Sequence, residues 1–222
     1  MMAKLFKQRQ KALSLHVDES SRLSFHEMCL RLVKLIDLTE DNLETPVKLA
    51  AISSLEVLAK AFPSDDMIFN RCLECVAKHI SSTDMAISSG SLRTTGALVC
   101  VIGSKALSQL PNIMKNILQR VHEVSTCPLE RSRSDHKKIA ELTNFKLPIL
   151  NSALVTLEAV VENLGGFLNP YLEDVLDIMV LHSEYALDSD TKTKSKAATV
   201  RKLLTEKIPV CFFKALVIHF MS

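Results

Sequence analysis

Apolar residues recur at intervals of three and four along most of the chain, which is the spacing of one face of an α-helix. Several of these stripes begin at a proline, which loses no hydrogen bond in the first turn of a helix. The expected helices cover about 23–36, 46–62, 67–80, 92–107, 148–164 and 192–208, with two more starting at Pro111 and Pro170. The pattern therefore predicts an all-α fold of long helices joined by short polar breaks.

Two of the expected helices match each other at a constant offset. Ala51 corresponds to Ala153, Leu55 to Leu157 and Glu56 to Glu158. Antiparallel helix pairs repeating every roughly 40–60 residues are typical of HEAT and armadillo-type units. Because one such pair cannot bury its apolar face alone, pairs stack into an α-solenoid. We expect this α-solenoid, with an irregular helical bundle as the alternative.

Three stretches depart from the helical pattern. Residues 1–21 are polar and mixed, which predicts an arm or a ragged helix before a repeat array over 22–209. Residues 126–144 are polar as well and predict a long, mobile loop. Residues 210–222 form an atypical apolar tail, expected either to pack on the preceding helix or to leave an apolar patch.

The charges of the chain nearly balance, with 27 Lys and Arg against 25 Asp and Glu and a net charge of +2. A strong nucleic-acid binder usually carries a larger basic excess, so RNA contact would need a local patch. The weak candidates for RNA or partner contact are Arg131, Arg133, Lys137 and Lys138 in the loop, and Lys192, Lys194, Lys196, Arg201 and Lys202 on the last helix. The alternative is that both groups are simply solvated.

No pattern predicts a catalytic site, a cofactor site or a metal site. Cys72 and Cys75 form a CxxC pair, but the pair lies within an expected helix, without a second CxxC, and structural packing is the favoured interpretation. The 7 histidines fall in no hydrolase or metalloprotease motif. The cysteines look like packing residues of a reducing compartment, and no signal sequence or apolar span of about 20 residues stands out. These features favour a non-enzymatic protein of the cytosol or nucleus.

Residues 45–59, 86–98 and 154–172 carry a resemblance to a known family. They resemble the HEAT-repeat protein of the small-subunit processome, that is, U-three small-nucleolar-RNA-associated protein ten or HEAT-repeat-containing protein one, and its plant members most. Members are far longer, so the resemblance implies an internal piece from the late part of the solenoid. It also implies a non-catalytic nucleolar scaffold in early pre-ribosomal RNA processing and ribosomal-gene transcription.

The partners implied by the resemblance are other processome proteins, with pre-ribosomal RNA or U-three small nucleolar RNA contacted indirectly. It implies no cofactor, no membrane and no small-molecule substrate. The alternative is a generic HEAT or armadillo-type adaptor that binds peptide segments in transport or signalling. Because solenoids serve many functions, localisation in or outside the nucleolus would separate the two.

Overall fold

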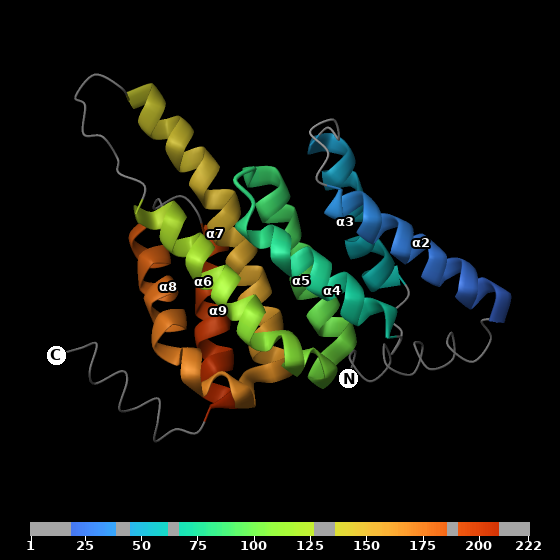
Figure 1. Ribbon diagram of the computed structural model, residues 1–222. Coiled ribbons are helices and arrows are strands. Elements are labelled where there is room, and N and C mark those ends of the chain that lie inside the picture. Colours follow the sequence, from blue (N-terminus) through green and yellow to red (C-terminus); the bar gives the residue numbers. More distant parts are fainter. Residues whose placement is uncertain (1–18, 39–44, 62–66, 127–135, 186–190, 209–222) are drawn as a thin grey trace.

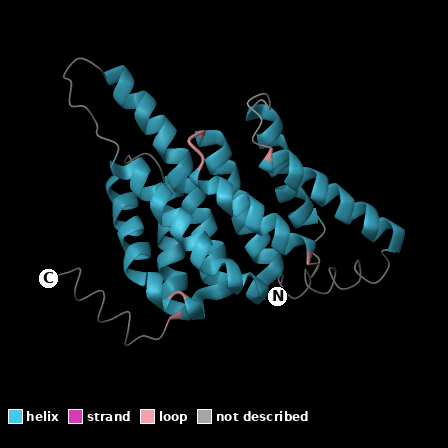
Figure 2. Ribbon diagram, in the orientation of Figure 1, coloured by secondary structure: helices cyan, strands magenta, loops and turns pink. Residues whose placement is uncertain are grey.

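The computed structural model describes residues 19–38, 45–61, 67–126, 136–185 and 191–208. Within these ranges every regular element is a helix, which confirms the all-α prediction (Figure 2). The α-helices are α2 (Glu19–Asp37), α3 (Thr45–Ala61), α4 (Ile68–Lys78), α5 (Met85–Ile102), α6 (Leu110–Thr126), α7 (His136–Leu164), α8 (Leu172–Tyr185) and α9 (Thr191–Lys207). Short 3-10 turns follow several of them: η1 (His79–Ser81), η2 (Gly103–Gln109), η3 (Gly165–Phe167) and η4 (Asn169–Tyr171).

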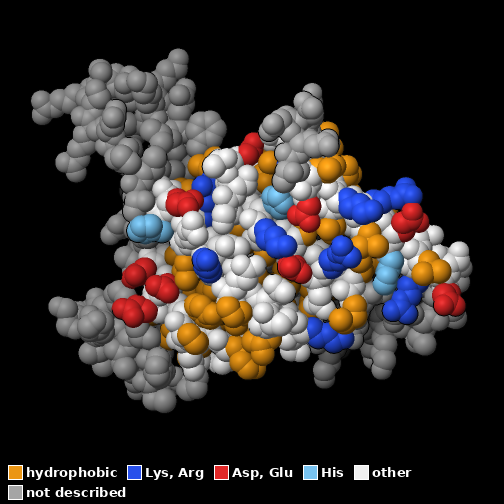
Figure 3. All heavy atoms as spheres, in the orientation of Figure 1, with side chains coloured by type: hydrophobic (Ala, Val, Ile, Leu, Met, Phe, Trp, Pro, Cys, Tyr) orange, Lys and Arg blue, Asp and Glu red, His pale blue; other side chains and the backbone are white. Residues whose placement is uncertain are grey.

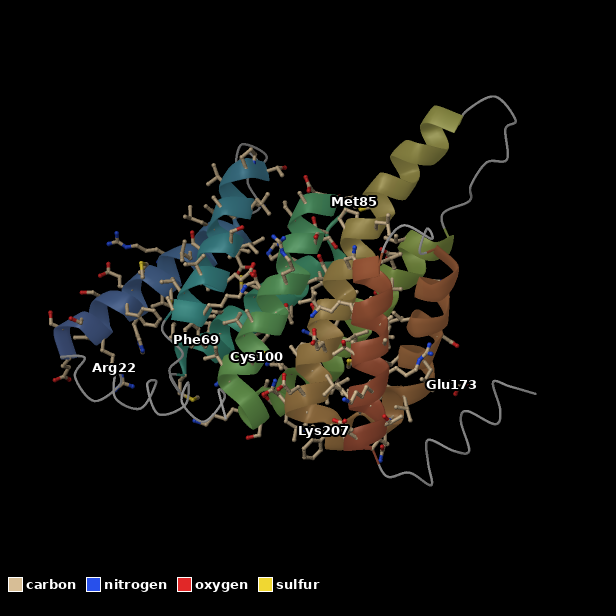
Figure 4. The ribbon with its side chains drawn as sticks, turned by 180° about the vertical axis from the view of Figure 1, so that it is seen from behind. Arg22, Phe69, Met85, Cys100, Glu173 and Lys207 are labelled. Carbon is tan, nitrogen blue, oxygen red and sulfur yellow. The ribbon has the colours of Figure 1, made fainter. Side chains whose placement is uncertain are left out.

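The helices form two layers, and the chain alternates between them. In the first layer α2 packs on α4, α4 on α6, and α6 on α8 (Figure 1). In the second layer α3 packs on α5, α5 on α7, and α7 on α9. Figure 4 shows this second layer from behind, with α5, α7 and α9 toward the viewer. Each consecutive pair, from α2 with α3 to α8 with α9, also packs together, so every pair touches the next through both of its helices.

The apolar stripes of the sequence meet between the layers. Cys29, Val33 and Ile36 of α2 are buried, as the helical spacing predicts. The largest side chains with almost no exposed surface come from both layers: Phe69, Ile36, Ile52, Leu55, Leu73, Ile80, Leu92, Leu98, Ile113, Met114, Ile117 and Ile149. Burial of each such side chain contributes about 1.5–3 kcal/mol. The core is thus a continuous slab that runs between the layers from one pair to the next.

Helix α5 begins earlier than the sequence pattern suggested, at Met85 instead of Leu92. The reason is an N-cap: the Asp84 carboxylate accepts hydrogen bonds from the backbone N–H groups of Ala86 at 2.8 Å and Ile87 at 3.1 Å. The helix ends at Gly103, whose φ of 60° suits glycine. Between these ends α5 lies at the centre of the second layer, in contact with α3, α4 and α7.

The predicted loop over 126–144 is wrong in its second half, because α7 begins at His136. Residues 127–135 lie outside the described residues. Pro148, expected to open a helix, lies inside α7. Figure 1 shows the first part of α7 extending beyond the other helices. The polar and charged run at the start of this helix, His136, Lys137 and Lys138, is what suggested a loop from the sequence.

Two segments of the described chain, Met85–Val124 and Leu147–Phe167, reach the length and hydropathy of a membrane span. They are more apolar than the sequence analysis expected. In each, 61% of the window is buried inside the fold. A helix packed in a protein core is as apolar as a membrane span. The burial of these segments between the two layers therefore explains their high hydropathy.

The predicted arm is described only from Glu19 onward, where it forms the first turn of α2. The tail over 210–222 lies outside the described residues. The last described helix, α9, matches the expected 192–208 closely.

Candidate functional site

Buried hydroxyl groups join the helices of the second layer in a repeated manner. Thr94 of α5 donates from Oγ1 to the carbonyl oxygen of Ile52 in α3, at 3.2 Å. Thr156 of α7 donates in the same sense to the carbonyl of Leu92 in α5, at 2.6 Å. In each case the later helix donates to the backbone of the earlier one. Because both threonines are fully buried, these bonds determine how each helix aligns with its neighbour.

The sequence match between the two helices has a structural counterpart. Ser54 in α3 and Thr156 in α7 occupy matching positions. Ser54 donates to the carbonyl four residues earlier at 2.8 Å, and Thr156 shares its one hydroxyl proton between the carbonyls of Leu92 and of Ser152, the latter also four residues earlier at 2.8 Å. The matched Leu55 and Leu157 are both fully buried. The matched leucines therefore share a buried position, whereas of the two hydroxyl residues only Thr156 also bonds to the preceding helix.

The exposed side of the second layer carries a strip of paired charges, which we call the outer face. It consists of Glu56, Val57 and Lys60 of α3, Arg93 and Cys100 of α5, Val155, Glu158 and Glu162 of α7, and Lys196 of α9. Glu56 lies 2.5 Å from the Nζ of Lys60 and 3.9 Å from the Nε of Arg93. Glu158 forms an ion pair with Lys196 of the next helix. Acids and bases thus alternate across the helices, so the outer face has little net charge.

Two apolar side chains interrupt this charged strip. Val57 is 63% exposed and Val155 is 36% exposed. Single exposed apolar residues are ordinary, but these two lie beside charged groups on α3 and α7, the helices that pack on either side of α5. Such a mixture of apolar and oppositely charged groups suits a protein partner better than a nucleic acid.

The outer face holds one cysteine, Cys100, whose sulfur accepts a hydrogen bond from the Asn163 amide at 3.7 Å. Partial desolvation and then the nearby Glu162 carboxylate raise the pKa of the Cys100 thiol. At neutral pH this thiol is therefore protonated and a poor nucleophile. The outer face offers a contact surface, and this thiol adds no activated group to it.

The basic residues predicted to contact RNA do not form one described patch. Arg131 and Arg133 lie outside the described residues. Only the backbone is described for Lys137 and Lys138 in α7 and for Lys192 and Lys194 in α9.

Among the described basic candidates, Lys196 pairs with Glu158, and Lys202 lies 3.9 Å from Glu206. Arg201 is exposed. On the opposite side of the molecule, Figure 3 shows Lys and Arg side chains interspersed with Asp and Glu. The described surface therefore mixes both signs of charge, in keeping with the small net charge of the chain.

The two cysteines of the CxxC pair lie in different surroundings. Cys72 is fully buried against Cys29, and a hydrogen bond with Cys29, then burial, raises its pKa far above the ordinary range. This confirms that Cys72 packs as a small apolar residue. Cys75 instead points to the edge of the core, where its sulfur lies 3.3 Å from Oδ1 of Asp37. Sequence reasoning missed this neighbour, because Asp37 belongs to another helix.

No family model matches the chain. Over 207 residues, or 93% of the chain, the sequence is 50% identical to the uncharacterized protein At3g06530 of Arabidopsis thaliana. The aligned region makes up 9% of that protein. The chain thus spans less than a tenth of the length of the curated relative it matches.

Proposed function

We propose that the chain is a section of a non-catalytic α-solenoid scaffold, with each consecutive helix pair as one repeat unit. The observation that carries this proposal is the stacking of both helices of each pair on those of the next pair. Stacked pairs of this kind bury a continuous core that no single pair could form. The repeated bonds from Thr94 and Thr156 to the preceding helix support the same reading.

We further propose that this scaffold acts in ribosome biogenesis, within the small-subunit processome in the nucleolus. This rests on the resemblance of residues 45–59, 86–98 and 154–172 to the HEAT-repeat processome family. The small share of a much longer relative that the chain covers fits an internal section of a long protein. The expected partners are other processome proteins, with pre-ribosomal RNA contacted indirectly.

We assign the contact with protein partners to the outer face. Acidic and basic side chains balance there, and Glu56 and Glu158 are already in ion pairs, so a partner would be recognised by apolar contact and by exchange of ion pairs rather than by a net charge. Direct RNA contact should be weak. Changing Arg131, Arg133, Lys137 and Lys138 together to Ala should lower RNA affinity only modestly and mainly at low salt.

The test uses the full-length protein that contains this chain. Its depletion should cause precursors of small-subunit ribosomal RNA to accumulate and mature small-subunit RNA to fall. A rescue copy carrying Val57→Glu with Val155→Glu should fold, because both side chains are exposed, but should fail to restore processing. A matched control copy carries Leu23→Glu, which changes an exposed residue of α2 in the other layer. This control should rescue as well as the unchanged protein, and the tagged protein should lie in the nucleolus.

Two outcomes would count against these proposals separately. Normal precursor levels together with a location outside the nucleolus would reject the processome role and leave the generic adaptor. Full rescue by the double valine variant, with unchanged co-purifying proteins, would reject the outer face as the contact surface while leaving the processome role intact.

A further inference from the structure

Three side chains with metal-binding atoms converge at one end of the first layer. Asp37 is the last residue of α2, Cys75 lies in the last turn of α4, and His79 follows in η1. Their ligand atoms all lie within 4.8 Å of one another. Oδ1 of Asp37 is 3.3 Å from Sγ of Cys75 and 3.4 Å from Nε2 of His79. The four-residue spacing of Cys75 and His79 places both on the side of α4 that faces α2.

The two separations from Asp37 match those within a zinc coordination shell. Zinc binds sulfur at about 2.3 Å and nitrogen or oxygen at about 2.0–2.2 Å in a tetrahedral arrangement. Ligand atoms at those distances lie about 3.3–3.6 Å apart in a tetrahedron. The separations of Asp37 from Cys75 and from His79 therefore already suit a bound ion. The ligand atoms of Cys75 and His79 lie within 4.8 Å of each other and would draw together around the ion.

We propose that Asp37, Cys75 and His79 form a binding site for a divalent transition-metal ion, with Zn²⁺ as the best-suited ion and water at the fourth position. The donor set decides the class of metal. A thiolate and an imidazole favour zinc-like ions, whereas Mg²⁺ and Ca²⁺ bind through oxygen atoms. Nothing in the CxxC spacing indicates this site, since Cys72 turns into the core and takes no part in it.

The surroundings leave room for the ion and its water. An open hollow of about 540 Å³ lies beside the site, and Asp37, Cys75, Asn70 and Glu74 are among the residues that line it. Cys75 itself is only 2% exposed, whereas the side chain of Asp37 is 49% exposed. The sulfur thus forms the inner wall of the site and the carboxylate its outer edge. A bound ion would keep one coordination position toward this hollow.

Metal binding must displace a proton from the thiol. Burial, and then the nearby Asp37 carboxylate, raise the pKa of Cys75 to about 12, so the free thiol is protonated at neutral pH. On binding, the sulfur–metal bond forms, and the thiol proton passes to solvent. Affinity should therefore rise with pH. The other charged groups around the hollow are Arg71, Glu74 and Lys78, and Lys78 lies 3.3 Å from Glu74.

A bound ion would join α2 to α4, two neighbours in the first layer (Figure 1). Binding to the folded chain alone should raise the melting temperature as the free zinc concentration rises. The same ion should therefore be detectable both as a bound ligand and as a gain in stability.

The experiment uses the full 222-residue chain, reduced and stripped of metal with a chelator. Zinc is then titrated against a coloured chelating indicator, and Co²⁺ serves as a spectroscopic probe. We expect one metal per chain, thiolate-to-cobalt charge-transfer absorption in the near ultraviolet, and tetrahedral cobalt bands in the visible. Asp37→Asn and His79→Gln should each lower affinity at least tenfold, and Cys75→Ala should abolish the charge-transfer band.

The controls separate this site from other thiols and from misfolding. Cys100→Ala removes an exposed thiol of the other layer and should leave both affinity and spectrum unchanged. Asp37 and His79 are partly exposed, so their variants should keep the far-ultraviolet circular dichroism of the unchanged chain. Absence of stoichiometric metal, or affinity unchanged in both of these variants, would overturn the proposal.

Discussion

The packing of α5 against α7 can be tested at a single glycine. A Cβ atom added at Gly96 would lie 3.2 Å from the Cα of Thr156 and 3.6 Å from the Cβ of Ala159. Carbon atoms in relaxed contact are about 3.5–4.0 Å apart, so Gly96→Ala requires α7 to move away by roughly 0.3–0.8 Å. The atom in the way belongs to the backbone, so no side-chain rotation can relieve the contact.

The free-energy change has two opposing parts. Replacing Gly by Ala in a helix gains about 0.8–1.0 kcal/mol. Overpacking of a tight contact costs about 1–3 kcal/mol, because the structure must shift to make room. The shift would also stretch the 2.6 Å bond from Thr156 to Leu92, one turn before Gly96. We therefore expect Gly96→Ala to lower the free energy of unfolding by about 0–2 kcal/mol.

Gly90, in the same helix, provides the matched control. Its added Cβ would lie 3.0 Å from Cδ1 of Leu49, the end of a flexible side chain that can rotate away. The helix-propensity gain then roughly offsets a side-chain strain of about 0.5–1.5 kcal/mol. The loss of freedom in the unfolded chain is alike for both substitutions and cancels in the comparison. Because the propensity gain is common to both, Gly96→Ala should be less stable than Gly90→Ala by about 1 kcal/mol, the overpacking cost less the side-chain strain.

The assay is urea unfolding followed by far-ultraviolet circular dichroism, at equal protein concentrations for the two variants. In a parallel thermal unfolding experiment, the same difference should lower the melting temperature of Gly96→Ala by about 2–4 °C relative to Gly90→Ala. A Gly96→Ala variant that equals or exceeds Gly90→Ala in stability would show that the α7 backbone is not held against α5 as the structure has it.

Ser88→Ala removes the hydroxyl that accepts from the buried Nε of Arg120 at 3.1 Å. It should lower the free energy of unfolding by about 1–3 kcal/mol in urea titration, and a smaller loss would mean that Arg120 finds another acceptor. The raised pKa of Cys75 favours the protonated thiol in the folded state. Its contribution to stability is therefore full below the ordinary pKa of 9.0 and is lost as the pH rises toward about 12. In metal-free buffer, Cys75→Ala should flatten this alkaline loss, and an unchanged slope would contradict the assignment. Lys196→Gln breaks the ion pair with Glu158 and should cost about 0.2–1 kcal/mol, less at high salt, because both side chains are partly exposed. A salt-independent loss would point to packing instead of charge.

The sequence by itself determined the helical class and most helix bounds. The apolar period over Cys29, Val33 and Ile36 is satisfied only by a helix with one buried face, and all three residues are buried. Pro46 marked the start of α3 to within a residue, because a first-turn proline costs the helix nothing. These signals are local, so they can be read without knowledge of the neighbours.

The same local signals failed at the start of α7. The first part of α7 mixes charged and polar residues with its apolar ones, and Pro148 marked a start where the helix continues. The folded chain shows that α7 is one continuous helix from His136 to Leu164, with Pro148 inside it. A proline inside a helix is uncommon, so the sequence alone placed the start of this helix at Pro148.

The candidate sites depended most on tertiary structure. From the sequence, Lys196 was a weak candidate for RNA or partner contact, with solvation as the alternative, and its pairing with Glu158 follows only from the packing of α7 on α9. The spacing of Cys75 and His79 was visible in the sequence, but the approach of Asp37 was not. Such groups come from helices far apart in the chain, and their meeting depends on the alignment of neighbouring helices. That alignment is decided by buried contacts such as the bond from Thr156 to Leu92, which no local pattern encodes.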